Sequence, residues 1–205
     1  MRKSLFIVID GMDGSGKSEL IKLLHNYLFT KNKKYRILTT REPTNGTYGE
    51  KIRRFLIEEK DPSLNAEVLL ELFTKDREEH LKNVILPFLE NNDHELNIIL
   101  CDRYYYSTIA FQSTQGMDIE RTLEENKNFR KPDIAFILDV KPEIALERIK
   151  NRDKEKFEQI EFMQKLRKNF LDLSIHLDDN IKIVDASKNP DEVFKDVKEE
   201  IDKLL

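Results

Sequence analysis

The sequence has little cysteine, no excess of positive charge and no long apolar run. Its 205 residues include a single cysteine, Cys101, which excludes an intrachain disulfide framework and is expected to pack inside an apolar strand. The formal net charge of −4 provides no broad basic field for nucleic acid. No apolar run approaches the roughly 18 residues of a membrane-spanning helix, and residues 1–4 lead into a strand rather than a signal peptide. We therefore expect a cytoplasmic protein with a small anionic ligand and with neither a membrane nor a nucleic acid as partner.

An apolar strand leads directly into a glycine-rich loop near the start of the chain. The loop has the spacing G-x-x-x-x-G-K-S and consists of Gly11, Met12, Asp13, Gly14, Ser15, Gly16, Lys17 and Ser18. Such a loop turns backbone N–H groups inward, and the helix that follows adds the positive end of its dipole. The motif predicts a polyphosphate site, with Lys17 against the β- and γ-phosphates and the Ser18 hydroxyl as a ligand of Mg²⁺.

Short apolar strands alternate with helical patterns along the chain. Strands are predicted at 5–10, 36–40, 96–101, 133–138 and 181–184. The longest helical patterns lie at 17–31, 66–89, 158–177 and 190–205, and Pro87 is expected to kink or interrupt the second of these. Because 205 residues with 39% hydrophobic content suit one α/β core, we expect a single domain over residues 1–205. The predicted architecture is a three-layer P-loop NTPase fold, whose five-stranded parallel sheet is covered by helices on both faces.

Charged residues follow several predicted strands, where ligands gather in a parallel sheet. Arg41 and Arg103 are natural clamps for a second phosphate, although either could instead form a surface salt bridge with Glu42 or Asp102. Asp102 resembles a Walker B carboxylate, which would hold a water of Mg²⁺ or orient Arg103, and both roles remain open.

No histidine stands where a catalytic base would be needed. His25, His80, His94 and His176 all fall on helical or loop segments and are expected to be surface or packing residues far from strand ends. A phosphate acceptor needs no general base, because its oxygen is already anionic near neutral pH. The missing base therefore favours a phosphorylated acceptor.

Two pairs of residues spaced four apart could contact a planar base. Phe73 and Arg77 share one helical face, and so do Thr108 and Gln112. On spacing alone, the first pair could equally be a core phenylalanine beside a solvated arginine, and the second could be ordinary polar residues.

Together these segments closely resemble the thymidylate kinase family of P-loop nucleoside monophosphate kinases. The matching segments are 10–18, 40–43 with 49–53, 72–77, 102–112 and 184–187. The resemblance implies ATP-dependent phosphorylation of dTMP to dTDP with Mg²⁺, usually by a homodimer. It also implies that the loop residues 11–18 bind ATP and that segment 185–190 borders the adenine.

The resemblance gives individual residues a role. Phe73 would stack on thymine, Arg77, Thr108 and Gln112 would contact its polar edge, and Arg53 would lie near the base. Arg103 and Arg41 would hold the acceptor phosphate, with Asp13 beside the acceptor and the metal. Phe111 would lie under the sugar, and Ser107 belongs to the same dTMP-binding segment. Asp10 stands where the family often has glutamate, so its contact to a metal-bound water is open.

The loop itself contains no arginine, although some family members have one there. The positive charge that neutralises the transferring phosphoryl group must then come from a lid at about 148–158. Arg148 and Arg152 are the candidates, and we expect Arg152 more than Arg148 to act as the catalytic cation. The open alternative is that this segment is only a solvated, charged helix end.

Other acceptors and other classes of protein remain open at this point. The acceptor could be another pyrimidine monophosphate or a deoxynucleoside, or the chain could be a non-catalytic nucleotide-binding module. A GTPase is disfavoured, because no D-x-x-G follows an apolar strand apart from residues 13–16 inside the phosphate loop itself, and no N-K-x-D is present.

Overall fold

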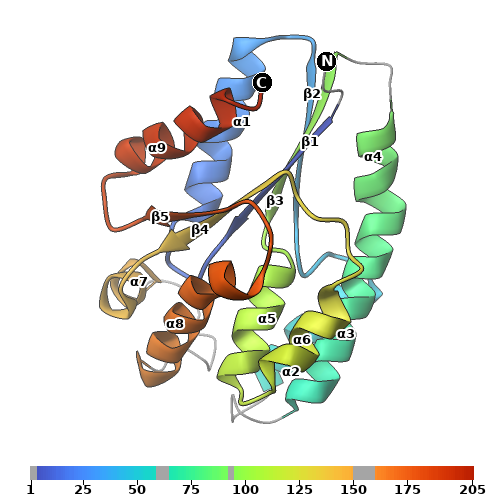
Figure 1. The fold of residues 1–205 in the computed structure, drawn as a ribbon, viewed down its shortest axis with the longest axis vertical. Helices are drawn as coiled ribbons and strands as arrows, with labels where there is room; N and C mark the ends of the chain where they lie inside the picture. Colours follow the sequence, from blue (N-terminus) through green and yellow to red (C-terminus); the bar gives the residue numbers. More distant parts are fainter. Residues whose placement is uncertain (1–3, 59–64, 92–94, 150–159) are drawn as a thin grey trace.

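A single parallel sheet forms the centre of the molecule (Figure 1). The computed structural model describes residues 4–58, 65–91, 95–149 and 160–205. Five strands pair in the order β2-β3-β1-β4-β5, all of them parallel. They are β1 (Ser4–Asp10), β2 (Tyr35–Arg41), β3 (Leu96–Asp102), β4 (Ile134–Asp139) and β5 (Ile181–Asp185). The central strands β1, β3 and β4 are almost wholly buried, which explains why they read as continuous apolar runs.

Helices cover both faces of the sheet, as predicted (Figure 1). Successive side chains of β1 point to opposite faces, so Leu5, Ile7 and Ile9 enter one core while Phe6 and Val8 enter the other. The first core is closed by α1 (Lys17–Lys31) and α9 (Pro190–Asp202). The second is closed mainly by α4 (Leu86–Glu90), α5 (Tyr105–Thr114) and α8 (Ile160–His176). The three-layer fold is therefore confirmed.

The long helical pattern before β3 contains the expected interruption. Helix α3 (Ala66–His80) continues into a π-helical turn, Leu81–Ile85, and then into α4. The N–H of Leu86 donates to the carbonyl of Leu81, five residues back. Pro87 has no N–H to donate, so the break was correctly predicted, but it takes the form of a wider turn placed just before the proline.

Three shorter helices connect the layers. They are α2 (Thr47–Glu58), α6 (Ile119–Asn126) and α7 (Pro142–Ile149). The prediction missed α6, because only Ile119 and Leu123 of its residues pack against a core. Its start nevertheless has a clear signal, since the Asp118 carboxylate accepts a hydrogen bond from the N–H of Glu120 at 3.0 Å.

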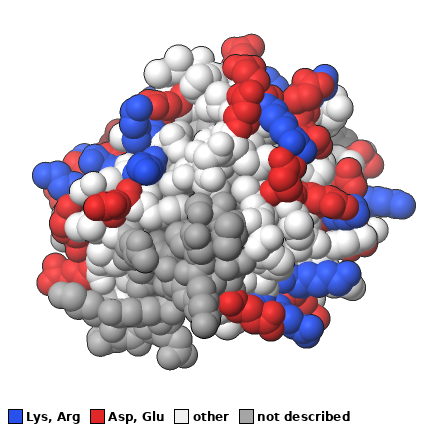
Figure 2. All heavy atoms as spheres, turned by 90° about the horizontal axis from the view of Figure 1, so that it is seen from below, with Lys and Arg blue, Asp and Glu red and all other residues white. Residues whose placement is uncertain are grey.

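Charges of both signs are mixed on the surface. Figure 2 shows the face seen from the lower end of Figure 1, where Lys and Arg stand beside Asp and Glu around the edge. The described part of this face thus has no broad positive patch. Within the described residues, none of the helices is both long and apolar enough to span a bilayer. Cys101 is a free, buried thiol in β3, as expected.

Candidate active site

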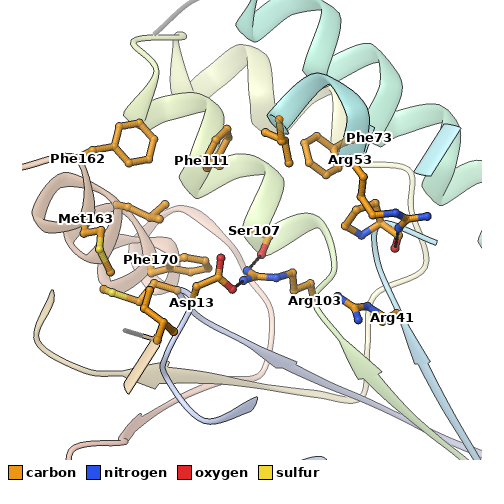
Figure 3. Close-up of a pocket in the computed structure, with 15 residues that line it drawn as sticks. Asp13, Arg41, Arg53, Phe73, Arg103, Ser107, Phe111, Phe162, Met163 and Phe170 are labelled. Carbon is orange, nitrogen blue, oxygen red and sulfur yellow. Dashed lines mark hydrogen bonds and ion pairs between the residues drawn. The ribbon is translucent and has the colours of Figure 1, made fainter. Parts of the chain in front are cut away.

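A cavity of about 200 Å³ opens beside the glycine-rich loop, at the carboxyl ends of β1, β2 and β3. Figure 3 shows its two halves: arginines gather toward one end, and aromatic side chains of α5 and α8 line the other. The lining residues are Met12, Asp13, Arg41, Pro43, Arg53, Leu56, Phe73, Arg103, Ser107, Phe111, Ile149, Phe162, Met163, Leu166 and Phe170. The expected convergence of the loop with Arg41 and Arg103 is therefore present.

The loop requires glycine where it approaches α7. At Gly14 the backbone has φ +78°, and a Cβ there would lie 2.4 Å from the carbonyl oxygen of Ala145. This close approach packs the loop directly against the helix that leads to the predicted lid.

Lys17 lies inside the loop, at the start of α1. Its ammonium donates to the carbonyls of Gly11 and Met12, each at 3.0 Å, and the residue is only 7% exposed. Burial and the nearby Arg103 lower the pKa of Lys17 to about 8, although neighbouring carboxylates partly oppose the shift. The loop therefore holds a poorly solvated cation where a phosphate would supply a better partner.

Arg103 connects the loop to α5 (Figure 3). Its guanidinium donates to the Gly11 carbonyl and the Ser107 hydroxyl, both at 2.9 Å, and to Asp13 at 2.6 Å. Burial disfavours its charge, but Asp13, Asp10 and Asp102 outweigh burial, so the pKa of Arg103 is raised. The backbone at Arg103 has φ 70°, a left-handed conformation that costs a non-glycine residue on the order of 1 kcal/mol. This strained but well-anchored arginine points its charge into the cavity.

Asp10 is fully buried and serves as a cap for α5. One carboxylate oxygen accepts from the N–H of Gly11 at 2.7 Å and the Ser107 hydroxyl at 2.6 Å. The other accepts from the N–H groups of Tyr104 and Ser107, both at 3.0 Å. Burial raises the pKa of Asp10, against the opposing effect of Arg103 and these hydrogen bonds. Protein donors thus occupy both oxygens of Asp10, and its contact with a metal-bound water stays an open prediction.

Asp102 and Ser18 suit a magnesium site better. One oxygen of Asp102 is buried and has no hydrogen-bond partner among the described residues, and Ser18 is exposed at the start of α1. Across the described ranges, no group of three or more His, Cys, Asp and Glu is arranged to hold a metal. Ser18 and Asp102 could together hold Mg²⁺ beside phosphate oxygens, which are common ligands of this ion in kinases.

The cationic end of the cavity carries two further arginines. Arg41 is exposed at the end of β2 and forms no hydrogen bond or ion pair within the described residues. Arg53, on α2, donates to the Pro43 carbonyl at 3.0 Å. Phe73 faces the cavity beside them, from α3 (Figure 3). At the opposite end Phe111 packs edge-on against Phe162, with ring centroids 5.4 Å apart.

Arg77, Thr108 and Gln112 lie behind the cavity wall instead of lining it. Arg77 is 1% exposed and donates to Glu42 at 2.9 Å, Asn126 at 2.7 Å and Thr108 at 2.8 Å. Gln112 is completely buried, and its side-chain oxygen has no partner among the described residues. None of the three lines the cavity in this structure, and their contact with the polar edge of a base stays a prediction.

His80 is a buried residue of α3, in agreement with the expected packing role on a helix. It is 3% exposed, with Nδ1 3.0 Å from Glu42 and Nε2 2.7 Å from the Thr40 hydroxyl. It therefore lies beside the end of β2, and the expectation that it is far from strand ends was wrong. A signal was available, since Phe73, Asp76, Arg77 and His80 follow the i, i+3, i+4, i+7 pattern of a single helical face.

The predicted lid is only partly described. Arg148 donates to the carbonyl of Ala186 at 3.0 Å and to that of Gly14 at 3.3 Å, so it joins the loop to the segment after β5. Arg152 lies outside the described residues, and its assignment as the catalytic cation stays a prediction.

The fold and the site define a P-loop nucleotide-binding protein with a second, arginine- and phenylalanine-lined pocket beside its phosphate loop. The family model for thymidylate kinase matches residues 9–197. A probable thymidylate kinase of Archaeoglobus fulgidus is 37% identical over 203 residues, covering 98% of this chain and 96% of that protein. The thymidylate kinase of Caldicellulosiruptor saccharolyticus is 38% identical over 212 residues, covering 99% and 98%. The chain belongs to the thymidylate kinase family.

Proposed function

We propose that this protein transfers the γ-phosphoryl group of ATP to dTMP, giving ADP and dTDP. The observation that carries the proposal is the continuity of one cavity with the phosphate loop through the Asp13–Arg103 pair. This continuity allows a donor phosphate on the loop to face an acceptor phosphate held by Arg103 and Arg41. The flat ring of Phe73 supports a planar base at the far end of the acceptor.

The chemistry requires alignment and charge neutralisation more than proton transfer. Lys17 and the loop N–H groups would hold the donor phosphates, and Arg103 would orient the acceptor phosphate for in-line attack. When bound, Mg²⁺ would supply positive charge that offsets part of the negative charge of the donor phosphates. The Ser18 hydroxyl would bind this ion, with Asp102 holding one of its waters.

The remaining parts of the proposal rest on the family and on the sequence. Arg152, with Arg148, would supply positive charge from the lid. We also propose that each chain forms a single domain over residues 1–205. Two such chains would form a homodimer, which would work in the cytoplasm.

The direct test is a comparison of acceptors with ATP and Mg²⁺. Initial rates of ADP release are measured with dTMP, dUMP, dGMP and thymidine, and dTDP is identified as the product. We expect dTMP to give the highest kcat/KM. A higher kcat/KM for another monophosphate would identify that monophosphate, instead of dTMP, as the acceptor. Binding of ATP and dTMP without formation of dTDP would indicate a non-catalytic module.

A further inference from the structure

Three buried polar residues of α3 bind the turn that follows β2. His80 contacts Glu42 at 3.0 Å, and Arg77 contacts the other oxygen of the same carboxylate at 2.9 Å. Asp76, which is 2% exposed, accepts from the N–H of Thr44 at 2.8 Å and from its hydroxyl at 2.6 Å. The turn is thus held on both sides of Pro43 by one face of one helix.

This turn forms the cationic end of the cavity. Arg41 and Pro43 line it directly, and the Pro43 carbonyl accepts the hydrogen bond that orients Arg53. Phe73, which lines the same end, lies on α3 itself. The relative position of the phenylalanine ring and the arginines therefore depends on how tightly α3 is attached to the turn.

His80 has a defined orientation in this attachment. Because a carboxylate only accepts hydrogen bonds, Nδ1 must carry the hydrogen that faces Glu42. Nε2 then faces the Thr40 hydroxyl. If the histidine were removed, one oxygen of a carboxylate that is 3% exposed would lose its partner, and the turn would have to shift to find another.

We propose that His80 is a positioning residue for the acceptor site. Acting through Glu42, it fixes the turn that carries Arg41 and Pro43 against the helix that carries Phe73. This inference rests on the proposed function, because the acceptor held at this end of the cavity is taken to be dTMP.

Two conservative replacements separate the contacts of the histidine. His80→Asn places its amide nitrogen near the position of Nδ1, so it can still donate to Glu42, while His80→Gln places its amide near Nε2 and leaves Glu42 without that donor. Loss of a buried hydrogen bond to a carboxylate should raise the KM for dTMP about tenfold or more in His80→Gln. We expect a much smaller rise in His80→Asn, and in both variants an unchanged KM for ATP and a kcat within about threefold of the wild type.

Thr40→Val is the matched control, because it removes the partner of Nε2 and leaves the contact with Glu42 intact. It should keep the KM for dTMP near the wild-type value. In a Glu42→Gln background, replacing His80 by Gln should add little further effect, since the two residues act through one contact. The melting temperature of each variant is measured as a control, to establish that the variant is folded at the assay temperature.

The outcomes distinguish this inference from the proposed function. If the wild type does not phosphorylate dTMP, the proposed function fails. If the wild type is active and His80→Gln lowers only the melting temperature, or if His80→Asn raises the KM for dTMP as much as His80→Gln does, the positioning role of His80 is overturned.

Discussion

The guanidinium of Arg103 lies 2.6 Å from the carboxylate of Asp13, which joins the phosphate loop to the segment between β3 and α5. Asp13 is 60% exposed on its side chain, so this ion pair by itself contributes little to stability. Its importance is geometric. The same guanidinium also binds the Gly11 carbonyl and Ser107, so Arg103 is held in one orientation at the cavity, where we propose that the acceptor phosphate binds.

Replacing Arg103 by Lys should therefore damage catalysis although the charge is kept. A lysine ammonium cannot reproduce a planar fork that contacts the loop, α5 and a phosphate together. We expect kcat/KM for dTMP to fall by about a hundredfold or more, with the dissociation constant for ATP changed by less than about threefold. Steady-state kinetics and ATP titration measure the two effects. An Arg103→Lys variant with wild-type kcat/KM would remove Arg103 from the acceptor site.

The pKa of Lys17 predicts a proton-linked binding step. It is lowered to about 8 in the free protein, and a bound polyphosphate should raise it again because the ammonium gains anionic partners. The complex then holds more protons than the free protein. Binding of ATP at pH 8 should take up about half a proton, and affinity should fall as the pH rises above 8.

Calorimetry in two buffers with different ionisation enthalpies measures this uptake directly. Lys17→Met is the control, because ATP's own protonation is the same for both proteins and only the contribution of the lysine is removed. Equal proton uptake by the wild type and Lys17→Met at pH 8 would contradict the assignment.

Local patterns in the sequence were sufficient to predict the parallel sheet and the phosphate loop. The central strands β1, β3 and β4 are buried on both faces and therefore appear as apolar runs, and the phosphate loop has its own spacing. Because ligands gather at the carboxyl ends of parallel strands, Arg41 and Arg103 were expected near one ligand site, and both line the same cavity. These features depend on neighbouring residues or on one topological rule, so no long-range contact had to be known.

Long-range contacts explain what the sequence did not reveal. Asp10 caps a helix that begins 95 residues later in the chain, and His80 reaches back to Thr40 and Glu42. The cap of Asp10 leaves no periodic signal, and the helical pattern of α3 places His80 on one face with Arg77 but does not identify its partners. Arg77 shares a face with Phe73, but only the packing of α3 against α5 and α6 shows that its guanidinium is buried.

Replacing Asp10 should change the stability of the protein but not its Mg²⁺ requirement, and replacing Ser18 should do the reverse. Asp10→Asn puts an amide among donors that need acceptors, so it should lower the free energy of unfolding by about 3 kcal/mol. The Mg²⁺ concentration for half-maximal activity should stay unchanged in that variant. Ser18→Ala should raise this Mg²⁺ concentration several-fold while leaving stability within about 0.5 kcal/mol, because Ser18 is exposed.

Chemical denaturation and a Mg²⁺ titration of activity measure these two quantities. If Asp10→Asn were as stable as the wild type but required more Mg²⁺, a contact of Asp10 with a metal-bound water would be supported and its role as a helix cap rejected.

The two lid arginines should affect different kinetic constants. Arg148 contacts the carbonyls of Gly14 and Ala186, which lie on the loop and after β5, so its loss should mainly weaken ATP binding. We expect Arg148→Ala to raise the KM for ATP about tenfold or less, with a modest change in kcat. Arg152, four residues further along, is predicted from the sequence to neutralise the transferring phosphoryl group. Arg152→Ala should therefore lower kcat by about a thousandfold and leave both nucleotide KM values almost unchanged.

Residues 12–15 contain no arginine, so Lys17 is the one cation within the loop sequence 11–18. Two carbonyls hold Lys17, and Asp13 and Ser107 hold Arg103. Under the proposed function, the lid would neutralise the charge that develops on the outer side of the transferring group. Single-turnover rates of both variants measure the chemical step, and a wild-type rate in Arg152→Ala together with a large loss in Arg148→Ala would move the catalytic role to Arg148.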